Sequence, residues 1–195
     1  MPLGAFKAAL MGTAGVSTAD VVLLQTQTAS DAASVTFTSG IDSTYGEYIF
    51  GFYNIHTETD LADLHFQVNV VDGSGYNETI TSTVFHARQN EAGDTTALGY
   101  ITGLDQAQGT AYQQLAENIG NLNDESAAGK LHLFNPSSTT YVKHFISRFN
   151  VYNGTDLTAD QYNAGYINVT AAIDAISFKV ESGNMNGKIK MWGVK

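Results

Sequence analysis

The clearest alternation of apolar and polar positions along the chain covers Asp63–Val71. Leu64, Phe66, Val68 and Val70 share one parity, and polar residues occupy the positions between them. Successive side chains of a strand point to opposite faces of its sheet. The alternation therefore predicts a strand with one buried face and one face in solvent.

The run Glu47–His56 has a different pattern, because both of its parities are largely apolar. Tyr48, Phe50 and Phe52 occupy one parity, and the other carries isoleucine and tyrosine around Gly51. A strand that is apolar on both faces is covered on both faces, by a second sheet or by another subunit. Gly51 leaves room for a neighbouring side chain close to the backbone. This run is predicted to be the central strand of a β-sandwich.

Further short apolar runs, separated by turn residues such as Asn153-Gly154, predict nine or ten strands in total. Antiparallel strands at this spacing are typical of a β-sandwich, and a jelly roll is a common way to close that many of them. The predicted fold is therefore all-β and jelly-roll-like. The further predicted strands lie at Ser34–Ser39, Glu78–Arg88, Thr96–Thr102, Leu131–Leu133, Thr139–Tyr152, Tyr166–Ile173, Ala175–Glu181 and Lys188–Val194.

One segment has helical periodicity instead. Ala111, Leu115, Ile119 and Leu122 fall at positions i, i+4, i+8 and i+11 and make one apolar stripe. This spacing predicts a short helix over Thr110–Leu122, inserted between two strands.

The first thirty residues are predicted to form an N-terminal arm. Apolar residues in 3–11 have the spacing of a short amphipathic helix, and Val21–Leu24 is either a short strand or an adhesive segment. A stretch as apolar as this needs a surface to cover it, on the same domain or on a neighbouring subunit. The predicted organisation is an assembly arm over 1–30 and a single β-sandwich domain over 31–195.

The composition is weakly charged and acidic. Only 14% of the 195 residues are charged, against roughly 25% in an average globular protein. The net charge of −10 repels polyanions, so we expect no general nucleic-acid binding. Eight of the nine bases lie in residues 88–195. The favoured explanation is that strand surfaces commonly carry lysine, and the alternative is one end or face less negative than the rest.

Two further absences limit the chemistry of the chain. It has no cysteine, which excludes disulfides, thiolate metal sites and cysteine nucleophiles. No apolar run approaches the ~18 residues of a membrane span, so we expect no membrane partner.

The histidines and one acidic loop are the candidate metal ligands of the chain. His65, His132 and His144 lie in predicted strands that can converge, but no histidine pair has a metal-binding spacing, and we predict no metal site. Asp72–Glu78 has oxygen ligands at alternate positions but lacks those of a calcium loop, whose twelfth position here is Thr83. A hairpin turn is the favoured interpretation.

The chain also lacks complete catalytic sequence motifs. Gly129-Lys130 resembles the end of a phosphate-binding loop, but the remaining positions of that motif do not match. Glu58, Asp60 and Asp63 can supply the paired carboxylates of a glycosidase, as any acidic loop can. We therefore predict no catalytic residue, no cofactor-binding residue and no cofactor, and a protein that is not an enzyme.

Three stretches resemble virion structural proteins of tailed bacteriophages, mostly marine ones. They cover about a quarter of the chain and lie at Leu3–Gly15, Val35–Phe52 and Ser182–Val194. The resemblance implies a non-enzymatic component of a phage particle, without any catalytic residue to carry over.

Together these observations predict a capsid decoration or cement protein located in the virion. Its apolar arm would bind neighbouring subunits, as a homo-oligomer expected to be a trimer, and the partner would be the major capsid or tail protein. One alternative is a tail or fibre-associated protein. Another is a carbohydrate-binding module that recognises host surface glycans through exposed tyrosine and tryptophan. A third, a hydrolase, predicts a cleft with two facing carboxylates.

Overall fold

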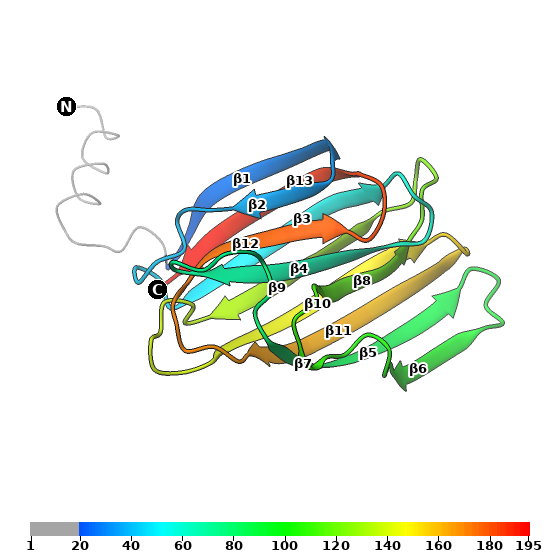
Figure 1. Cartoon of the computed structure of the whole chain (residues 1–195). Coiled ribbons are helices and arrows are strands. Elements are labelled where there is room, and N and C mark those ends of the chain that lie inside the picture. Colours follow the sequence, from blue (N-terminus) through cyan, green and yellow to red (C-terminus); the bar gives the residue numbers. More distant parts are fainter. Residues whose placement is uncertain (1–19) are drawn as a thin grey trace, which may run out of the picture.

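The computed structural model describes residues 20–195, which form thirteen strands and no helix (Figure 1). No segment of this described part is a helix long and apolar enough to cross a membrane. In chain order the strands are β1 (Val21–Ala32), β2 (Ser34–Phe37), β3 (Glu47–Thr57), β4 (Ala62–Val70), β5 (Ile80–Asn90), β6 (Thr96–Tyr100), β7 (Ala107–Gly109), β8 (Gln113–Ile119), β9 (Ala127–Phe134), β10 (Lys143–Asn153), β11 (Leu157–Ile167), β12 (Ile173–Val180) and β13 (Met185–Val194).

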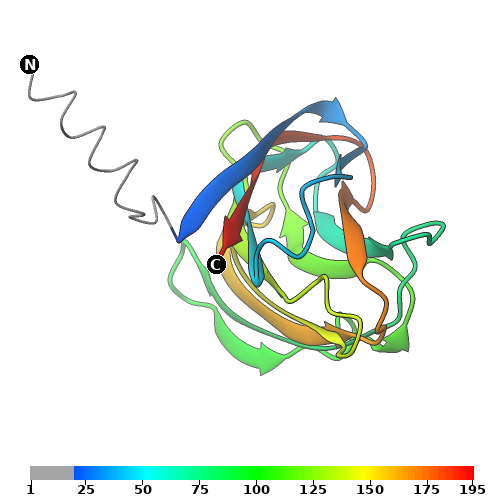
Figure 2. The same ribbon diagram turned by 90° about the vertical axis from the view of Figure 1, so that its left-hand side faces the viewer.

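All thirteen strands belong to one antiparallel sheet. Its main path is β1-β13-β3-β9-β10-β8-β4-β12-β2, while β11 branches from β10 and carries β5, on which β6 and β7 pair. The sheet folds over where β10 meets β8, which gives a long wall (β1-β13-β3-β9-β10-β11-β5-β6) and a short wall (β8-β4-β12-β2). Because β1 and β2 end the path and follow each other in the chain, the sheet is nearly closed into a barrel (Figure 2).

The predicted all-β, antiparallel class is therefore confirmed, but the predicted jelly-roll sandwich is wrong. A sandwich needs two separate sheets, whereas here the pair Asn153–Ile119 joins the two walls through backbone pairing. Alternation of side chains reports which face of a strand is buried, and it is the same for two stacked sheets and for one sheet folded over.

The predicted helix over Thr110–Leu122 is also wrong, because this segment contains strand β8. Every residue of Gln113–Ile119 except Asn118 is buried, so side chains on both faces of β8 are covered. A strand covered on both faces does not alternate, and its apolar residues can fall by chance at helical spacing.

Strand β11 was not predicted, and the predicted strand Tyr166–Ile173 covers only its end. The inward positions of β11 include the buried Gln161 and Asn163. These polar residues hide the alternation that would have marked Leu157–Ile167 as a strand.

Strand β3 is central, as predicted, with β13 on one edge and β9 on the other. Tyr48, Phe50 and Phe52 are buried between the walls. The opposite face is only partly covered: the ring of Trp192 lies over Gly51, and Tyr53 is 44% exposed.

The core lies between the two walls and is rich in aromatic rings. Phe178 of β12 lies 5.3 Å from Phe50, 5.0 Å from Phe52 and 6.2 Å from Phe37, measured between ring centroids. Edge-to-face and tilted pairs of this kind add about 0.5–1.5 kcal/mol each beyond the burial of apolar area. The pairs with Phe50 and Phe52 of β3 hold the short wall against the long wall, whereas Phe37 belongs to β2 of the short wall itself.

The segment Val21–Leu24 begins β1, which pairs with β13 from Val21–Val194 to Ala32–Met185. Of the two predicted alternatives, the structure has the strand. Residues 1–19, with the predicted helix in 3–11, lie outside the described residues.

Candidate functional site

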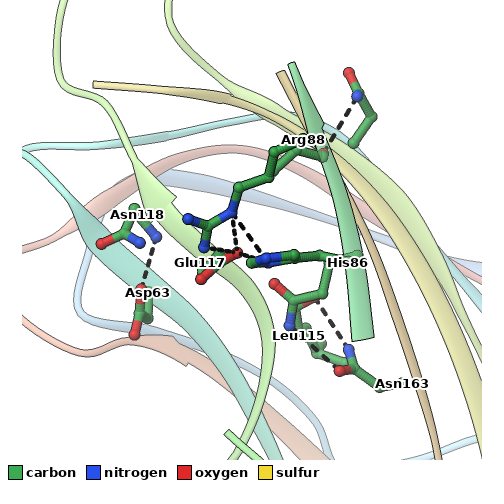
Figure 3. A network of polar contacts seen from close by, with 10 residues as sticks. Asp63, His86, Arg88, Leu115, Glu117, Asn118 and Asn163 are labelled. Carbon is green, nitrogen blue, oxygen red and sulfur yellow. Dashed lines mark hydrogen bonds and ion pairs between the residues drawn. The ribbon is translucent and has the colours of Figure 1, made fainter. Parts of the chain in front are cut away.

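A cluster of buried polar side chains lies where β8 faces β5 and β11 (Figure 3). The strands of this region place polar side chains at inward positions that a β core normally fills with apolar ones. The buried polar residues of this region are Ser82, His86, Gln113, Glu117, Ser147, Gln161 and Asn163.

Glu117 is the centre of this region. Its carboxylate accepts hydrogen bonds from Arg88, at 3.2 Å from Nε and also from Nη2, and its Oε1 lies 2.5 Å from Nδ1 of His86. The Glu117 side chain is almost fully buried. A buried carboxylate is stable only when it is paired, so these contacts fix β8 against β5.

A bulge in β8 aims Glu117 at its partners. Asn118 has a left-handed backbone with φ of 52°, and the β4–β8 register shifts beside it. The backbone N–H of Asn118 donates to Asp63 Oδ1 at 2.7 Å. Burial, and to a smaller extent the neighbouring carboxylates of Glu181 and Glu117, raise the pKa of Asp63 to about 6, while the hydrogen bond from Asn118 opposes the shift.

The remaining polar groups connect β8 to the long wall. Ser82 Oγ donates to Gln113 Oε1 at 2.7 Å, and Asn163 donates to Ser147 Oγ at 2.9 Å and to the Leu115 carbonyl at 3.2 Å. Gln161 donates to Asn163 Oδ1 at 3.2 Å, while its own Oε1 is buried without a hydrogen-bond partner in the described residues. We interpret the interior network as a structural device that positions β8.

The outer face of the long wall carries a second candidate site, a cationic hollow. Four residues are consecutive partners across neighbouring strands there: Lys190, Gly51, Lys130 and Arg148. The ring of Trp192 lies over Gly51, and the outward residue Ala128 is small, so a depression of about 520 Å³ forms between the larger neighbours. Its lining consists of Gly51, Phe52, Tyr53, Ala128, Gly129, Lys130, His132, Ile146, Ser147 and Arg148.

The charges around the cationic hollow are only partly compensated. Arg148 binds Asp160 with two hydrogen bonds of 2.9 and 2.7 Å, and this contact lowers the pKa of Asp160. The Lys190 ammonium lies 5.3 Å from the ring centroid of Tyr53. Lys130 and Arg148 stand directly opposite each other across β9 and β10, an arrangement of like charges that destabilises a sheet.

A third feature is an apolar surface on the β5–β6 hairpin and the adjoining strand β11, here called the hairpin patch: Phe85, Leu98, Tyr100 and Tyr162. The rings of Phe85 and Tyr162 stack with centroids 4.7 Å apart. Leu98 is 79% exposed and Tyr100 is 53% exposed. Within residues 20–195, β6 pairs only with β5, so its other edge presents unpaired backbone groups.

The structure does not bring the candidate histidines together. His65 lies on the short wall, whereas His132 and His144 lie on the outer face of the long wall. Nδ1 of His132 contacts Glu47 Oε1 at 2.5 Å. No group of three or more metal-binding side chains occurs in the part of the chain that the structure describes.

The two candidate loop motifs do not form ligand-binding loops. Asp72–Glu78 turns the chain, as predicted, but it connects β4 to β5, which do not pair, so it is not a hairpin. Gly129-Lys130 lies inside β9 rather than in a loop.

The three acidic candidates contact three different partners. Glu58 accepts from the backbone of Asn184, and Asp63 accepts from that of Asn118. The Asp60 carboxylate lies beside Gly154. They therefore form no carboxylate pair of the glycosidase type.

The cationic hollow was not predicted as a site, although its charge had a signal. The excess of bases late in the sequence had a less negative face as its alternative explanation, and the structure gathers Lys130, Arg148, Lys188 and Lys190 on one face. Lys143, from the same part of the sequence, is instead buried and donates to two backbone carbonyls.

Comparison with known proteins adds little to this description. No family model and no curated protein matches the sequence. Among solved structures, the chain is similar to a protein of unknown function from Bacteroides ovatus, with a TM-score of 0.29 and 4% sequence identity. The similarity covers 54% of this chain and 45% of that one, so the chain spans less than half of that protein. A similarity this weak carries no argument about function.

Proposed function

We propose that this protein is a non-enzymatic structural component of a phage virion, a capsid decoration protein that assembles with copies of itself. The observation that carries the proposal is the hairpin patch. A strand without charged residues that exposes both Leu98 and its backbone edge is a template for another strand.

The proposed assembly joins the two ends of the long wall. Strand β1 ends this wall on the side opposite to β6, and its residues Val21 and Leu23 are each about half exposed. Pairing β6 of one copy with β1 of the next is a head-to-tail contact, which closes into a ring when the rotation between copies allows it. The proposed ring is a trimer.

The N-terminal arm supplies the proposed contact with the particle. Its residues 21–30 already belong to β1, so the part that binds the major capsid or tail protein is residues 1–19, which include Leu3, Phe6 and Leu10. Burial of apolar surface at ~25 cal/mol per Å² would supply most of the affinity.

Self-assembly is tested with the double variant Leu98→Ser/Tyr100→Ser. We expect the wild type to have the mass of a trimer in light scattering after gel filtration, and the double variant to be a folded monomer. Val71→Ser is the matched control, because Val71 is also exposed but lies in the β4–β5 connection. A double variant that remains trimeric would contradict the role of the hairpin patch.

Placement on the particle is tested by imaging labelled virions and by removing residues 1–19. We expect the label on the capsid surface and the truncated protein to form trimers that no longer bind particles. A label confined to the tail would favour the tail or fibre-associated alternative. Normal decoration by the truncated protein would refute binding through residues 1–19.

A further inference from the structure

We propose that the cationic hollow binds a segment of an acidic polysaccharide, whose sugar units carry carboxylate or sulfate groups. This site does not rest on the proposed role in assembly, because it lies on the middle strands of the long wall, between the edges that the trimer would use.

Charge is the first argument. The chain has a net charge of −10, yet Lys130, Arg148, Lys188 and Lys190 gather around one depression. The acids beside them are already engaged, Asp160 by Arg148 and Glu47 by His132.

The arrangement of these bases has a cost in the isolated protein. Asp160 balances the charge of Arg148, but Lys130 on the neighbouring strand has no ion pair within the described residues, and Lys188 and Lys190 share one face of β13. Repulsion between neighbouring like charges destabilises a sheet, and an anion placed among them removes that cost. A bound anionic group is therefore the occupant that this geometry favours.

Shape is the second argument. The hollow, of about 520 Å³, falls in the range of sites for small ligands. Its lining includes the small residues Gly51 and Ala128, and the ring of Trp192 lies over Gly51. Tyr53 and Ile146 give it apolar sides, Lys130 and Arg148 line it, and Lys190 lies beside it over the ring of Tyr53. A sugar ring has C–H groups on its faces and polar groups at its edge, so an acidic sugar can contact both kinds of surface at once.

Two other occupants fit less well. A nucleic-acid duplex carries one negative charge per about 1.7 Å of its length, so many closely spaced charges would lie beyond the hollow over a strongly acidic protein. A second copy binding through the same face would place its own bases against these bases.

The experiment measures binding of the full-length protein to three immobilised polymers: polygalacturonate, dextran sulfate and uncharged dextran. We expect binding to one or both acidic polymers, weakening as salt is raised, and none to dextran. Retention on polygalacturonate alone would identify carboxylates as the recognised group, and retention on dextran sulfate alone would identify sulfates. Equal binding to all three polymers, or to none, would overturn the proposal.

Variants locate the site. We expect Lys130→Gln and Lys190→Gln each to weaken binding about tenfold, as for the loss of one hydrogen bond to a charged group. Ala128→Trp should abolish binding by filling the hollow without changing its charge; thermal unfolding verifies that each variant is folded. Lys179→Gln is the matched control, because Lys179 belongs to the short wall and contacts Tyr112.

Three results would count against the site. Equal losses for Lys179→Gln and Lys130→Gln would show attraction by overall charge alone. Tighter binding of single-stranded DNA than of either acidic polymer would identify a nucleic acid as the occupant. If the protein binds neither acidic polymer because copies of it associate through this face, the occupant of the hollow is a second copy. The trimer and particle-binding tests are independent of all three results.

Discussion

Asp63 is the residue whose charge the fold controls most clearly. Its pKa is raised to about 6 by burial, so between about pH 4 and pH 6 the folded protein holds a proton that the unfolded chain has released. The stability from this group is complete below about pH 4 and is lost as the pH rises through 6. We expect Asp63→Asn to raise the free energy of unfolding at pH 7 by roughly 1–3 kcal/mol, measured in urea.

The difference between wild type and Asp63→Asn isolates this group from other carboxylates. That difference should nearly vanish at pH 4, where both side chains are neutral. Asp94→Asn is a suitable control, because hydrogen bonds from Asn90 and Thr95 lower the pKa of Asp94 and its substitution should not stabilise the protein. An equal gain for Asp63→Asn at both pH values would show that the charge is not the cause.

Residue patterns also set the limit of what the sequence could reveal about the candidate sites. Lys190, Gly51 and Lys130 meet because three strands far apart in the chain pair in one register. A shift of one residue in any strand would send its side chain to the other face. The excess of late bases could therefore predict a less negative face, but not which of them share a hollow.

At the scale of elements, predictability followed the chemistry of the interior. Strand β4 was predicted from its alternation because it packs apolar side chains against the core. Strands β8 and β11 were not, because they enclose polar groups such as Gln113, Glu117 and Asn163. A sequence that buries a polar network looks locally like a helix or a loop, since the usual apolar signal is missing.

The network around Glu117 should therefore determine how firmly β8 is held. We expect Glu117→Gln to lower the free energy of unfolding by roughly 2–4 kcal/mol, because Arg88 and His86 lose a buried carboxylate. The measurement is urea unfolding at pH 7, with the exposed Asp124→Asn as control. In a double-mutant cycle, Arg88→Gln should lower the free energy of unfolding much less in the Glu117→Gln background than in the wild type. Additive losses would refute coupling between the two side chains.

At the scale of the whole molecule, the fold class was easier to predict than the closure of the sheet into one folded-over barrel. Turn residues and alternation indicated an antiparallel all-β chain, but the number of sheets depends on the single junction between β10 and β8. That junction consists of one residue pair at the ends of two strands, which leaves no periodic trace in the sequence. The edge strands of the sheet were equally hard to predict: the start of β1 was predicted either as a strand or as an adhesive segment.

The role of β1 as the end of the sheet gives a prediction for two truncations. Removing residues 1–19 leaves every described strand, whereas removing residues 1–30 also removes most of β1 and exposes the edge of β13. We expect the longer truncation to be less stable than the shorter one by roughly 2–5 kcal/mol, because it loses most of the cross-strand pairs between β1 and β13. Thermal and urea unfolding of the two proteins measure the difference. Equal stability would mean that β1 adds nothing to the fold, and residues 1–30 would then act together as one arm.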